Sequence, residues 1–240
     1  MDSFDWKKLN SNVQVDDTKK KYYGQYYCSL KYFCPGGRII FHTKLDEVSI
    51  TDAVAQRQAY HRQFNHGGSW RALKEKIERI DVDQLNAMNN IKIKYNTDIK
   101  FRIEEPLLKI YARDESTIIN IANELSSWGD KLQHVSRPQN DAAQAHLDNG
   151  AIITKTDIGY KYKIMCKDGT CNNKESIVGY LTALEDQVKV SKSVWRNLKS
   201  YKNNWTWGIW FYANDPQLVN MLHIIEPGFV TNIHEMVLAK

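Results

Sequence analysis

The sequence predicts an α+β fold of two tandem ferredoxin-like (split βαβ) units, each an antiparallel sheet with helices packed on one face. Two observations lead to this prediction. Segments 31–37 (KYFCPGG) and 109–114 (KIYARD) are followed, in the same order, by the similar segments 163–169 (KIMCKDG) and 210–215 (WFYAND). The elements expected in the second half also follow one another as β-α-β-β-α-β, once one extra helix is left out. Matched segments in matched order indicate one unit used twice.

The first unit is expected over 18–137, after a flexible N-terminal arm at 1–17 that is polar and rich in Asp and Asn. Alternating side chains predict a strand over 22–34, a glycine turn, and a hairpin partner over 38–44. A helical insertion follows at about 49–88, and then strands at 91–95 and 99–112, the second with a bulge or an edge position at Pro106. Asp114 is the expected cap of a helix with the apolar stripe Ile118, Ile121, Ala122 and Leu125, and a strand follows at 132–135.

The second unit is expected over 138–240, because the turn-forming residues 136–141 lack apolar periodicity. Asp141 is the expected cap of a brief helix. Strands are predicted at 151–166 (with a turn near 157–159), 188–190, 205–212 and 233–238, and helices at 174–187, 193–201 and 215–225. Asp215, like Asp114, is expected to cap a helix rather than to bind Mg²⁺.

Composition narrows the class of protein. The 240 residues suffice for two small cores, and no window of eighteen apolar residues suggests a membrane span. The N-terminus lacks the basic start and apolar run of a secretory signal, so we expect a cytoplasmic protein, or one in the host cytoplasm or virion if it is viral. The four cysteines are then expected to be reduced thiols. No nucleotide-binding, nucleophile-elbow or zinc-protease motif occurs, so no cofactor is expected.

Charge and aromatic content favour one class of partner. The net charge is +5, and the chain holds 7 Trp, 13 Tyr and 7 Phe. Basic residues beside aromatics suit single-stranded nucleic acid, in which phosphates meet cations and bases stack on rings. Half-buried antiparallel sheets also favour Tyr and Trp, so this pattern has a structural interpretation as well.

The first candidate site lies in the helical insertion. A glycine pair before a serine-capped helix leaves backbone N–H groups available to an anion, and basic and aromatic residues surround the pair. Its candidate nucleic-acid-binding residues are Arg57, Tyr60, His61, Arg62, His66, Gly67, Gly68, Ser69, Trp70, Arg71 and Lys74. The alternative is a plain helix–Gly-Gly–helix corner whose basic residues face water. His61 and His66 are also the candidates for acid–base catalysis of RNA cleavage.

The second candidate site is the aromatic strand 205–212 (WTWGIWFY). Trp205, Trp207, Ile209 and Phe211 alternate on one face, with Trp210 and Tyr212 on the other. Helices cover only one side of the predicted sheet, so one face must meet solvent, a partner or a ligand. The candidates for base stacking are Trp207, Trp210 and Tyr212.

One pair of cysteines has a spacing that comes close to that of metal ligands. Cys166 and Cys171 come nearest to the spacing of a zinc-binding pair. Small buried strand residues are the default interpretation of all four cysteines, so no metal is expected.

Three functions follow from these patterns. The first is a non-enzymatic protein that binds single-stranded nucleic acid, with RNA preferred. The second is a structural or assembly protein of a virus or mobile element, which would self-associate. The third is a metal-independent endoribonuclease using His61 or His66. A basic chain of about 240 residues with two ferredoxin-like units resembles in layout the CRISPR repeat-processing endoribonucleases. Those enzymes have a glycine-rich loop near the C-terminus, where this chain offers only Pro227-Gly228-Phe229, so no catalytic residue is transferred.

Overall fold

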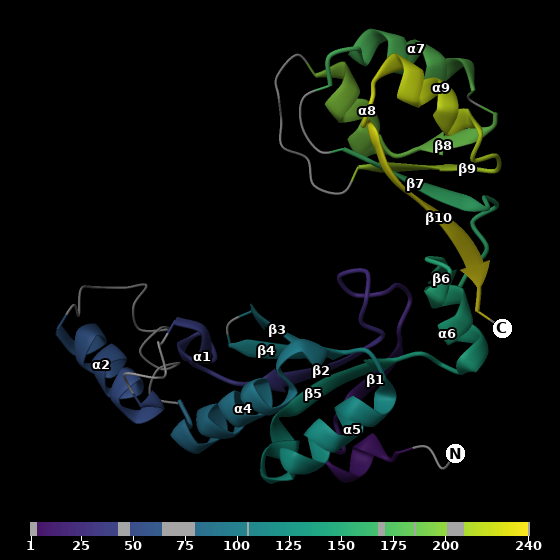
Figure 1. Cartoon of the computed structure of the whole chain (residues 1–240). Coiled ribbons are helices and arrows are strands. Elements are labelled where there is room, and N and C mark those ends of the chain that lie inside the picture. Colours follow the sequence, from purple (N-terminus) through teal and green to yellow (C-terminus); the bar gives the residue numbers. More distant parts are fainter. Residues whose placement is uncertain are drawn as a thin grey trace. The chain divides into compact units, whose positions relative to one another are not determined.

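The chain forms two compact units, residues 1–139 and 140–240 (Figure 1). The computed structural model describes residues 4–42, 49–63, 80–104, 106–167, 171–184, 186–200 and 209–239, without the side chains of His42 and of residues 61–63. The sequence placed the boundary between the units after Arg137. Each unit holds one five-stranded sheet and several helices, so the fold is mixed α+β.

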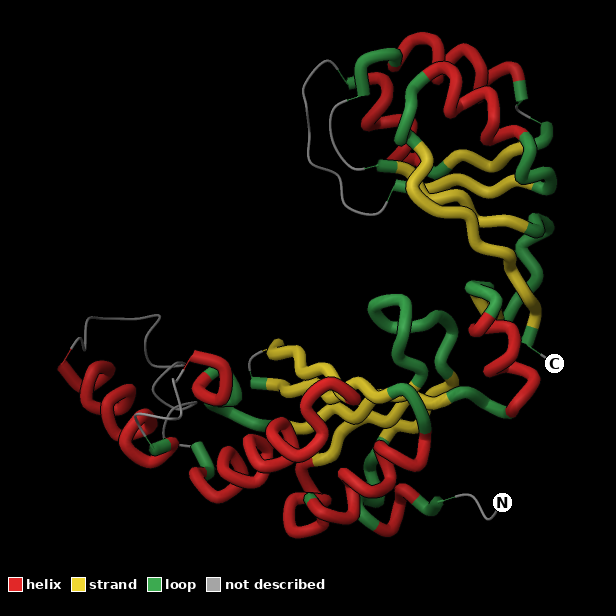
Figure 2. The backbone as a smooth tube through the Cα atoms, in the orientation of Figure 1, coloured by secondary structure: helices red, strands yellow, loops and turns green. Residues whose placement is uncertain are grey.

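The first unit combines five strands with helices at its ends and on one face of its sheet (Figures 1 and 2). Its strands are β1 (Gln14–Asp17), β2 (Cys28–Phe33), β3 (Ile99–Glu104), β4 (Leu107–Ala112) and β5 (Leu132–Arg137). Its described helices are α1 (Ile39–His42), α2 (Ile50–Gln63), α4 (Val82–Tyr95) and α5 (Glu115–Glu124), with short 3₁₀ turns η1 (Trp6–Lys8), η2 (Asn96–Asp98) and η3 (Ser126–Lys131).

Alternation along the strands builds the core of the first unit. Leu30 and Tyr32 of β2 and Leu108 and Ile110 of β4 are fully buried, and they pack with residues of α4 and α5 such as Leu85 and Ile118. Asp114 caps α5, since its Oδ1 accepts a hydrogen bond from the Thr117 backbone N–H at 2.7 Å. The predicted cap and its apolar stripe are confirmed.

The predicted flexible arm over 1–17 is wrong for the residues the structure describes, 4–17. Trp6 and Val13 belong to the core of the first unit, and β1 pairs in parallel with β5, from Gln14 opposite His134 to Asp17 opposite Arg137. The polar composition of this segment did not indicate that Trp6 and Val13 are buried, because two isolated apolar residues produce no periodicity.

Three other predictions for the first unit also fail. Residues 39–42 form α1 instead of a hairpin strand, and residues 91–95 continue α4, whose buried face follows helical spacing through Leu85, Met88 and Ile91. Pro106 lies in the turn between β3 and β4 rather than at a bulge inside one long strand. Proline lacks a backbone donor and suits such a turn better than a sheet interior.

The second unit, like the first, combines five strands with several helices. Its strands are β6 (Ile152–Thr154), β7 (Tyr162–Cys166), β8 (Val188–Val190), β9 (Trp210–Ala213) and β10 (Val230–Leu238). Its helices are α6 (Asp141–Asp148), α7 (Lys174–Ala183), α8 (Lys192–Lys199) and α9 (Leu218–Ile225). Asn140, and not Asp141, caps α6. Asp215 accepts a hydrogen bond from the Gln217 N–H at 2.8 Å and so closes the turn before α9, while Gln217 occupies the cap position.

The two sheets have the same strand order. Counted along each unit, both run first, fifth, second, fourth, third: β1-β5-β2-β4-β3 and β6-β10-β7-β9-β8. The first and fifth strands pair in parallel in both units, and all other pairs are antiparallel. The sheets are therefore mixed, and the prediction of purely antiparallel sheets is wrong at one edge of each. The single strand predicted over 151–166 is likewise two strands, β6 and β7, separated in the sheet by β10.

Candidate nucleic-acid interface

Among the described residues of the second unit, helices α7, α8 and α9 cover one face of the sheet and leave the other face uncovered (Figure 1). Ile164 and Cys166 of β7 and Phe211 and Ala213 of β9 are buried against these helices in one core cluster. Because side chains alternate along a strand, Lys163, Met165, Trp210 and Tyr212 project from the opposite face.

Three aromatic rings meet on this helix-free face, and we call Tyr160, Trp210 and Tyr212 the aromatic platform. The Trp210 and Tyr212 rings lie 4.6 Å apart between centroids, at a tilt of 52°. Tyr160 stacks on Tyr212 at 6.1 Å with 22° between the ring planes. All three side chains are half-buried. The platform therefore presents ring surface to solvent while it is held by its own contacts.

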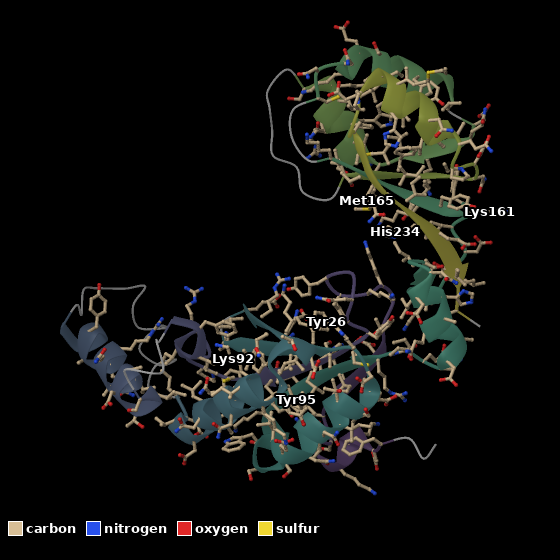
Figure 3. All side chains as sticks on the ribbon, in the orientation of Figure 1. Tyr26, Lys92, Tyr95, Lys161, Met165 and His234 are labelled. Carbon is tan, nitrogen blue, oxygen red and sulfur yellow. The ribbon has the colours of Figure 1, made fainter. Side chains whose placement is uncertain are left out.

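Basic side chains border the aromatic platform. The Lys163 ammonium lies 4.5 Å from the Trp210 ring centroid, within cation–π range. Cross-strand register places Tyr212 between Lys163 on β7 and the exposed Lys189 on β8, and places Met165 opposite Trp210. In Figure 3, Met165 and His234 lie on the side of the sheet away from the helices. The face thus combines stacking surface with cations, as recognition of single-stranded nucleic acid requires.

The loop before β7 holds Tyr160 over Tyr212. Gly159 has a φ of +75° and its N–H donates to Asp157 Oδ1 at 2.8 Å, which forms a tight turn. Asn214, just after β9, accepts from the Lys161 N–H at 3.0 Å and donates through Nδ2 to the Gly159 carbonyl at 3.4 Å. These bonds tie the loop to the end of β9. Partial burial also raises the pKa of Tyr212 above its ordinary value.

The first unit has a related arrangement at the same place in its strand order. Tyr111 on β4 packs against Tyr22 and Tyr23 from the loop between its first and second strands, at centroid distances of 4.9 and 5.2 Å. Lys100 on β3 is opposite Tyr111, and its ammonium lies 3.9 Å from the Tyr23 ring centroid. Tyr23 has a φ of +52° beside Gly24 at +75°, a conformation that tyrosine adopts only when its surroundings hold it. Here the loop covers Tyr111, which is buried, and Tyr23 supplies the exposed ring.

The structure brings together two of the residues predicted to bind nucleic acid, Trp210 and Tyr212. Arg57 is half-buried and Tyr60 is exposed, both on α2. The other predicted residues lie outside the described residues or side chains: His61, Arg62, His66, Gly67, Gly68, Ser69, Trp70, Arg71, Lys74 and Trp207. Binding or catalysis by these residues therefore stays a prediction.

Sequence reasoning missed Tyr160, Lys163 and Lys189 as parts of the site. Lys163 alternates with the buried Ile164, so the period-two pattern of β7 was the available signal. Tyr160 comes from a loop, and Lys189 from a three-residue strand, where periodicity carries little information. Only strand pairing places all three beside Trp210 and Tyr212.

The cysteines are packed as small core residues. Cys28 and Cys34 belong to the core of the first unit, Cys166 to that of the second, and Cys171 packs against the latter. Burial raises the pKa of Cys28 to about 12, and burial, together with Glu226, also raises that of Cys171. Among the described residues, no three His, Cys, Asp or Glu side chains form a group that could hold a metal ion.

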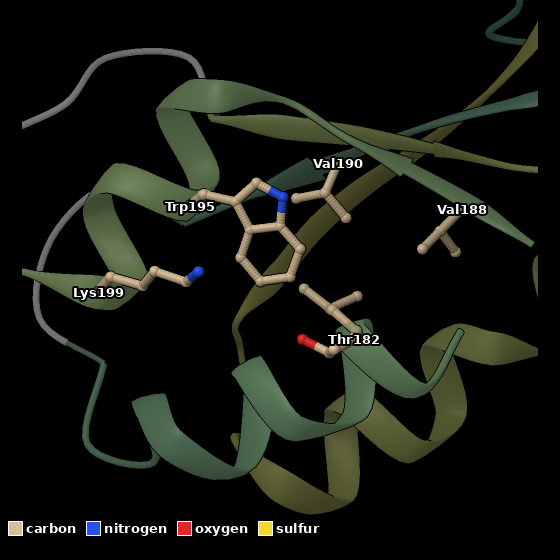
Figure 4. Close-up of a pocket in the computed structure, with 6 residues that line it drawn as sticks. Thr182, Val188, Val190, Trp195 and Lys199 are labelled. Atoms are coloured by element: carbon tan, nitrogen blue, oxygen red, sulfur yellow. The ribbon is translucent and has the colours of Figure 1, made fainter. Parts of the chain in front are cut away.

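A separate hollow lies on the helix side of the second unit (Figure 4). It has a volume of about 380 Å³ and is lined by Leu181, Thr182, Val188, Val190, Trp195 and Lys199. The Lys199 ammonium lies 5.2 Å from the Trp195 ring centroid. The described lining combines aliphatic and indole side chains with one hydroxyl and one ammonium.

No known protein family matches this chain, and no curated protein matches it in sequence. Within the described ranges, no helix is both long enough and apolar enough to cross a membrane.

Proposed function

We propose that the chain binds single-stranded nucleic acid, preferably RNA, on the helix-free face of its second sheet. The observation that carries the proposal is the aromatic platform with Lys163 against Trp210 and Lys189 beside Tyr212. Bases would stack on Trp210 and Tyr212, and the two lysines would meet phosphates. Such a surface binds with little sequence preference, because every base offers a flat ring while few hydrogen-bond donors or acceptors read its edge.

Replacing Trp210 by Ala tests the proposal. Fluorescence anisotropy with a labelled single-stranded RNA of about 20 nucleotides would measure affinity at low salt. Loss of one base–aromatic contact costs about 1–3 kcal/mol, so we expect the affinity to fall about 5- to 150-fold. A DNA oligonucleotide of the same sequence, run in parallel, measures the preference for RNA.

Trp195→Ala is the matched control, because Trp195 is also a half-buried tryptophan of the second unit but lines the hollow between α7 and α8. Its affinity should stay within about twofold of the wild type. Circular dichroism of both variants would verify folding. Absence of binding by the wild type, or equal losses in the two variants, would refute the proposed site.

We further infer that the two units are copies of one ferredoxin-like unit with an added first strand. The second to fifth strands of each unit lie in the order fifth, second, fourth, third, which is the 4-1-3-2 order expected of a split βαβ sheet. A loop tyrosine against a tyrosine of the fourth strand, with a lysine on the third, recurs in both units.

The register limits which residues correspond between the units. Ala112 pairs with Cys28 and Ile99, whereas Ala213 pairs with Tyr162 and Val188. If the two alanines are equivalent, Lys163 corresponds to Ser29 and not to Lys31. The duplication therefore rests on topology more than on the matched segments. A crystal structure in which the two sheets fail to superpose strand for strand would overturn it.

Assembly into a larger particle is the second candidate function. The observation that favours it is a pair of exposed apolar side chains on α9, Met221 and Ile224. A stable interface buries far more surface than two side chains supply, so nucleic-acid binding is the first proposal. Sedimentation of a concentrated sample as a monomer would exclude self-assembly.

A further inference from the structure

A row of basic side chains crosses the helix-free face of the first sheet. Cross-strand register aligns His134 on β5 with Lys31 on β2, Lys31 with Lys109 on β4, and Lys109 with Arg102 on β3. The alternate residues Leu30, Tyr32, Leu108 and Ile110 are buried against the helices, so this row projects from the other face. We call His134, Lys31, Lys109 and Arg102 the basic row.

Repulsion within the basic row lowers the stability of the sheet when no ligand is bound. Like charges directly opposite one another on neighbouring strands are destabilising, and Lys31–Lys109 and Lys109–Arg102 are two such pairs in succession. Strands are about 4.8 Å apart, so the backbones hold these side chains next to one another. An arrangement that packing alone disfavours indicates a ligand of the opposite charge.

Acidic neighbours compensate for only part of this charge. Glu104 contacts both Arg102 at 3.0 Å and Lys109 at 2.9 Å, while Asp16 contacts His134 at 3.0 Å. The hydrogen bond from Lys109, with the charges of Arg102 and Lys31, keeps the pKa of Glu104 below its usual range. Among the described residues, one carboxylate, that of Glu104, thus faces three cations: Lys31, Lys109 and Arg102. Arg102 is more than half exposed, and Lys109 and Lys31 are partly so.

Aromatic surface in the first unit lies at one end of the row. The Tyr23 ring is exposed above Tyr111 and lies under the Lys100 ammonium, and the Tyr23 hydroxyl accepts a hydrogen bond from the Arg102 guanidinium. The corresponding face of the second sheet carries Trp210 and Met165, where the first carries Lys109 and Lys31. The first face is therefore rich in charge and the second in ring surface.

We propose that the basic row of the first sheet binds the phosphate backbone of single-stranded nucleic acid. This inference rests on the proposed function, and it adds a second phosphate-binding surface, on the first unit, to the two lysines beside the aromatic platform. Lys31, Lys109 and Arg102 bind phosphate oxygens, and binding replaces the repulsion within the row by attraction. Contacts to phosphates carry no sequence information, so this surface adds affinity and salt dependence without adding specificity.

The salt dependence of binding by the full chain tests the inference. Each phosphate contact to a single strand contributes about 0.7 to the slope of log affinity against log salt concentration. The double variant Lys31→Gln/Lys109→Gln should lower the magnitude of that slope by about 1.4. Between about 50 and 200 mM salt, the variant should therefore lose roughly sevenfold less affinity than the wild type. Its thermal midpoint should stay close to that of the wild type, because two repulsive pairs are removed together with the Lys109–Glu104 ion pair.

The matched control is Lys94→Gln/Lys131→Gln, which removes the same charge from the same unit. Lys94 lies on α4 and is largely exposed, Lys131 lies on η3 and is partly exposed, and both are paired with acidic residues. We expect its slope to equal that of the wild type. An unchanged slope in Lys31→Gln/Lys109→Gln, or equal reductions in both double variants, would overturn the inference.

Trp210→Ala separates this inference from the proposed function. Stacking releases few counterions, so this variant should lose affinity while keeping the wild-type slope. If Trp210→Ala binds like the wild type but Lys31→Gln/Lys109→Gln lowers the slope, the basic row is upheld and the aromatic platform is rejected. If the wild type binds no single strand at low salt, both are rejected.

Discussion

Replacing Gly129 by Ala tests whether the N-terminal segment belongs to the fold of the first unit. A Cβ atom at this position would lie 2.9 Å from the Leu9 carbonyl oxygen and 3.4 Å from its carbonyl carbon and Cα. The Leu9 backbone has little freedom to move away. Its N–H donates to the Trp6 carbonyl at 3.1 Å, the neighbouring Asn10 donates to the Leu132 carbonyl at 2.8 Å, and Trp6 is 3% exposed.

The expected cost follows from the two ways of relieving this clash. Forcing an extra methyl into a packed site costs about 1–3 kcal/mol. Releasing the segment instead exposes Trp6, and exposing a large apolar side chain costs about 1.5–3 kcal/mol. Whichever is cheaper sets the loss, so the free energy of unfolding should fall by about 1–3 kcal/mol. Urea denaturation followed by circular dichroism would measure it.

Gly179→Ala is the matched control and should have the opposite sign. Gly179 is exposed within α7, and a Cβ there would meet nothing within 4 Å. Alanine in a helix interior is better than glycine by about 0.5–1 kcal/mol, so the second unit should become more stable. If Gly129→Ala is as stable as the wild type, residues 4–17 do not pack as described.

Three further predictions concern capping, pH and the two faces of the second sheet. Asp114→Ala should lower the free energy of unfolding by about 1 kcal/mol, because three hydrogen bonds at the start of α5 are lost; an unchanged urea midpoint would contradict the cap. The raised pKa of Cys28, about 12 in the folded chain because of burial and nearby acidic groups, means that its contribution to stability is complete below its ordinary pKa of about 8.5 and is lost as pH rises toward 12. Raising the pH from 8 to 10 should therefore lower the free energy of unfolding of the wild type by about 2 kcal/mol more than that of Cys28→Ala. Equal losses in the two proteins would refute this. Phe211→Ala should cost about 3–5 kcal/mol and Tyr212→Ala clearly less, because Phe211 is fully buried and Tyr212 is half-buried; a reversed order in urea denaturation would reverse the assignment of faces.

Local patterns predicted the elements whose signals are short-range. The cap and stripe of α5 were predicted because Asp114 and its apolar residues lie within one helix. The strand at 188–190 was predicted with its bounds, and Trp210 and Tyr212 were placed opposite Phe211, because alternation along a strand is a property of neighbouring residues. Residues 91–95 fit both the alternation of a strand and the helical spacing of the residues before them. They continue α4, because Ile91 extends the buried face of that helix.

The sequence by itself determined that this is a mixed α+β chain, which of its segments form most strands, and which side chains share a strand face. Only the tertiary structure decided which strands are neighbours. The parallel pair of β1 with β5, the pairing that lines up Lys31, Lys109 and Arg102, and the stacking of Tyr160 on Tyr212 all join residues that are distant in sequence. Periodicity carries no information about such partners, because pairing depends on how the whole chain closes its two cores.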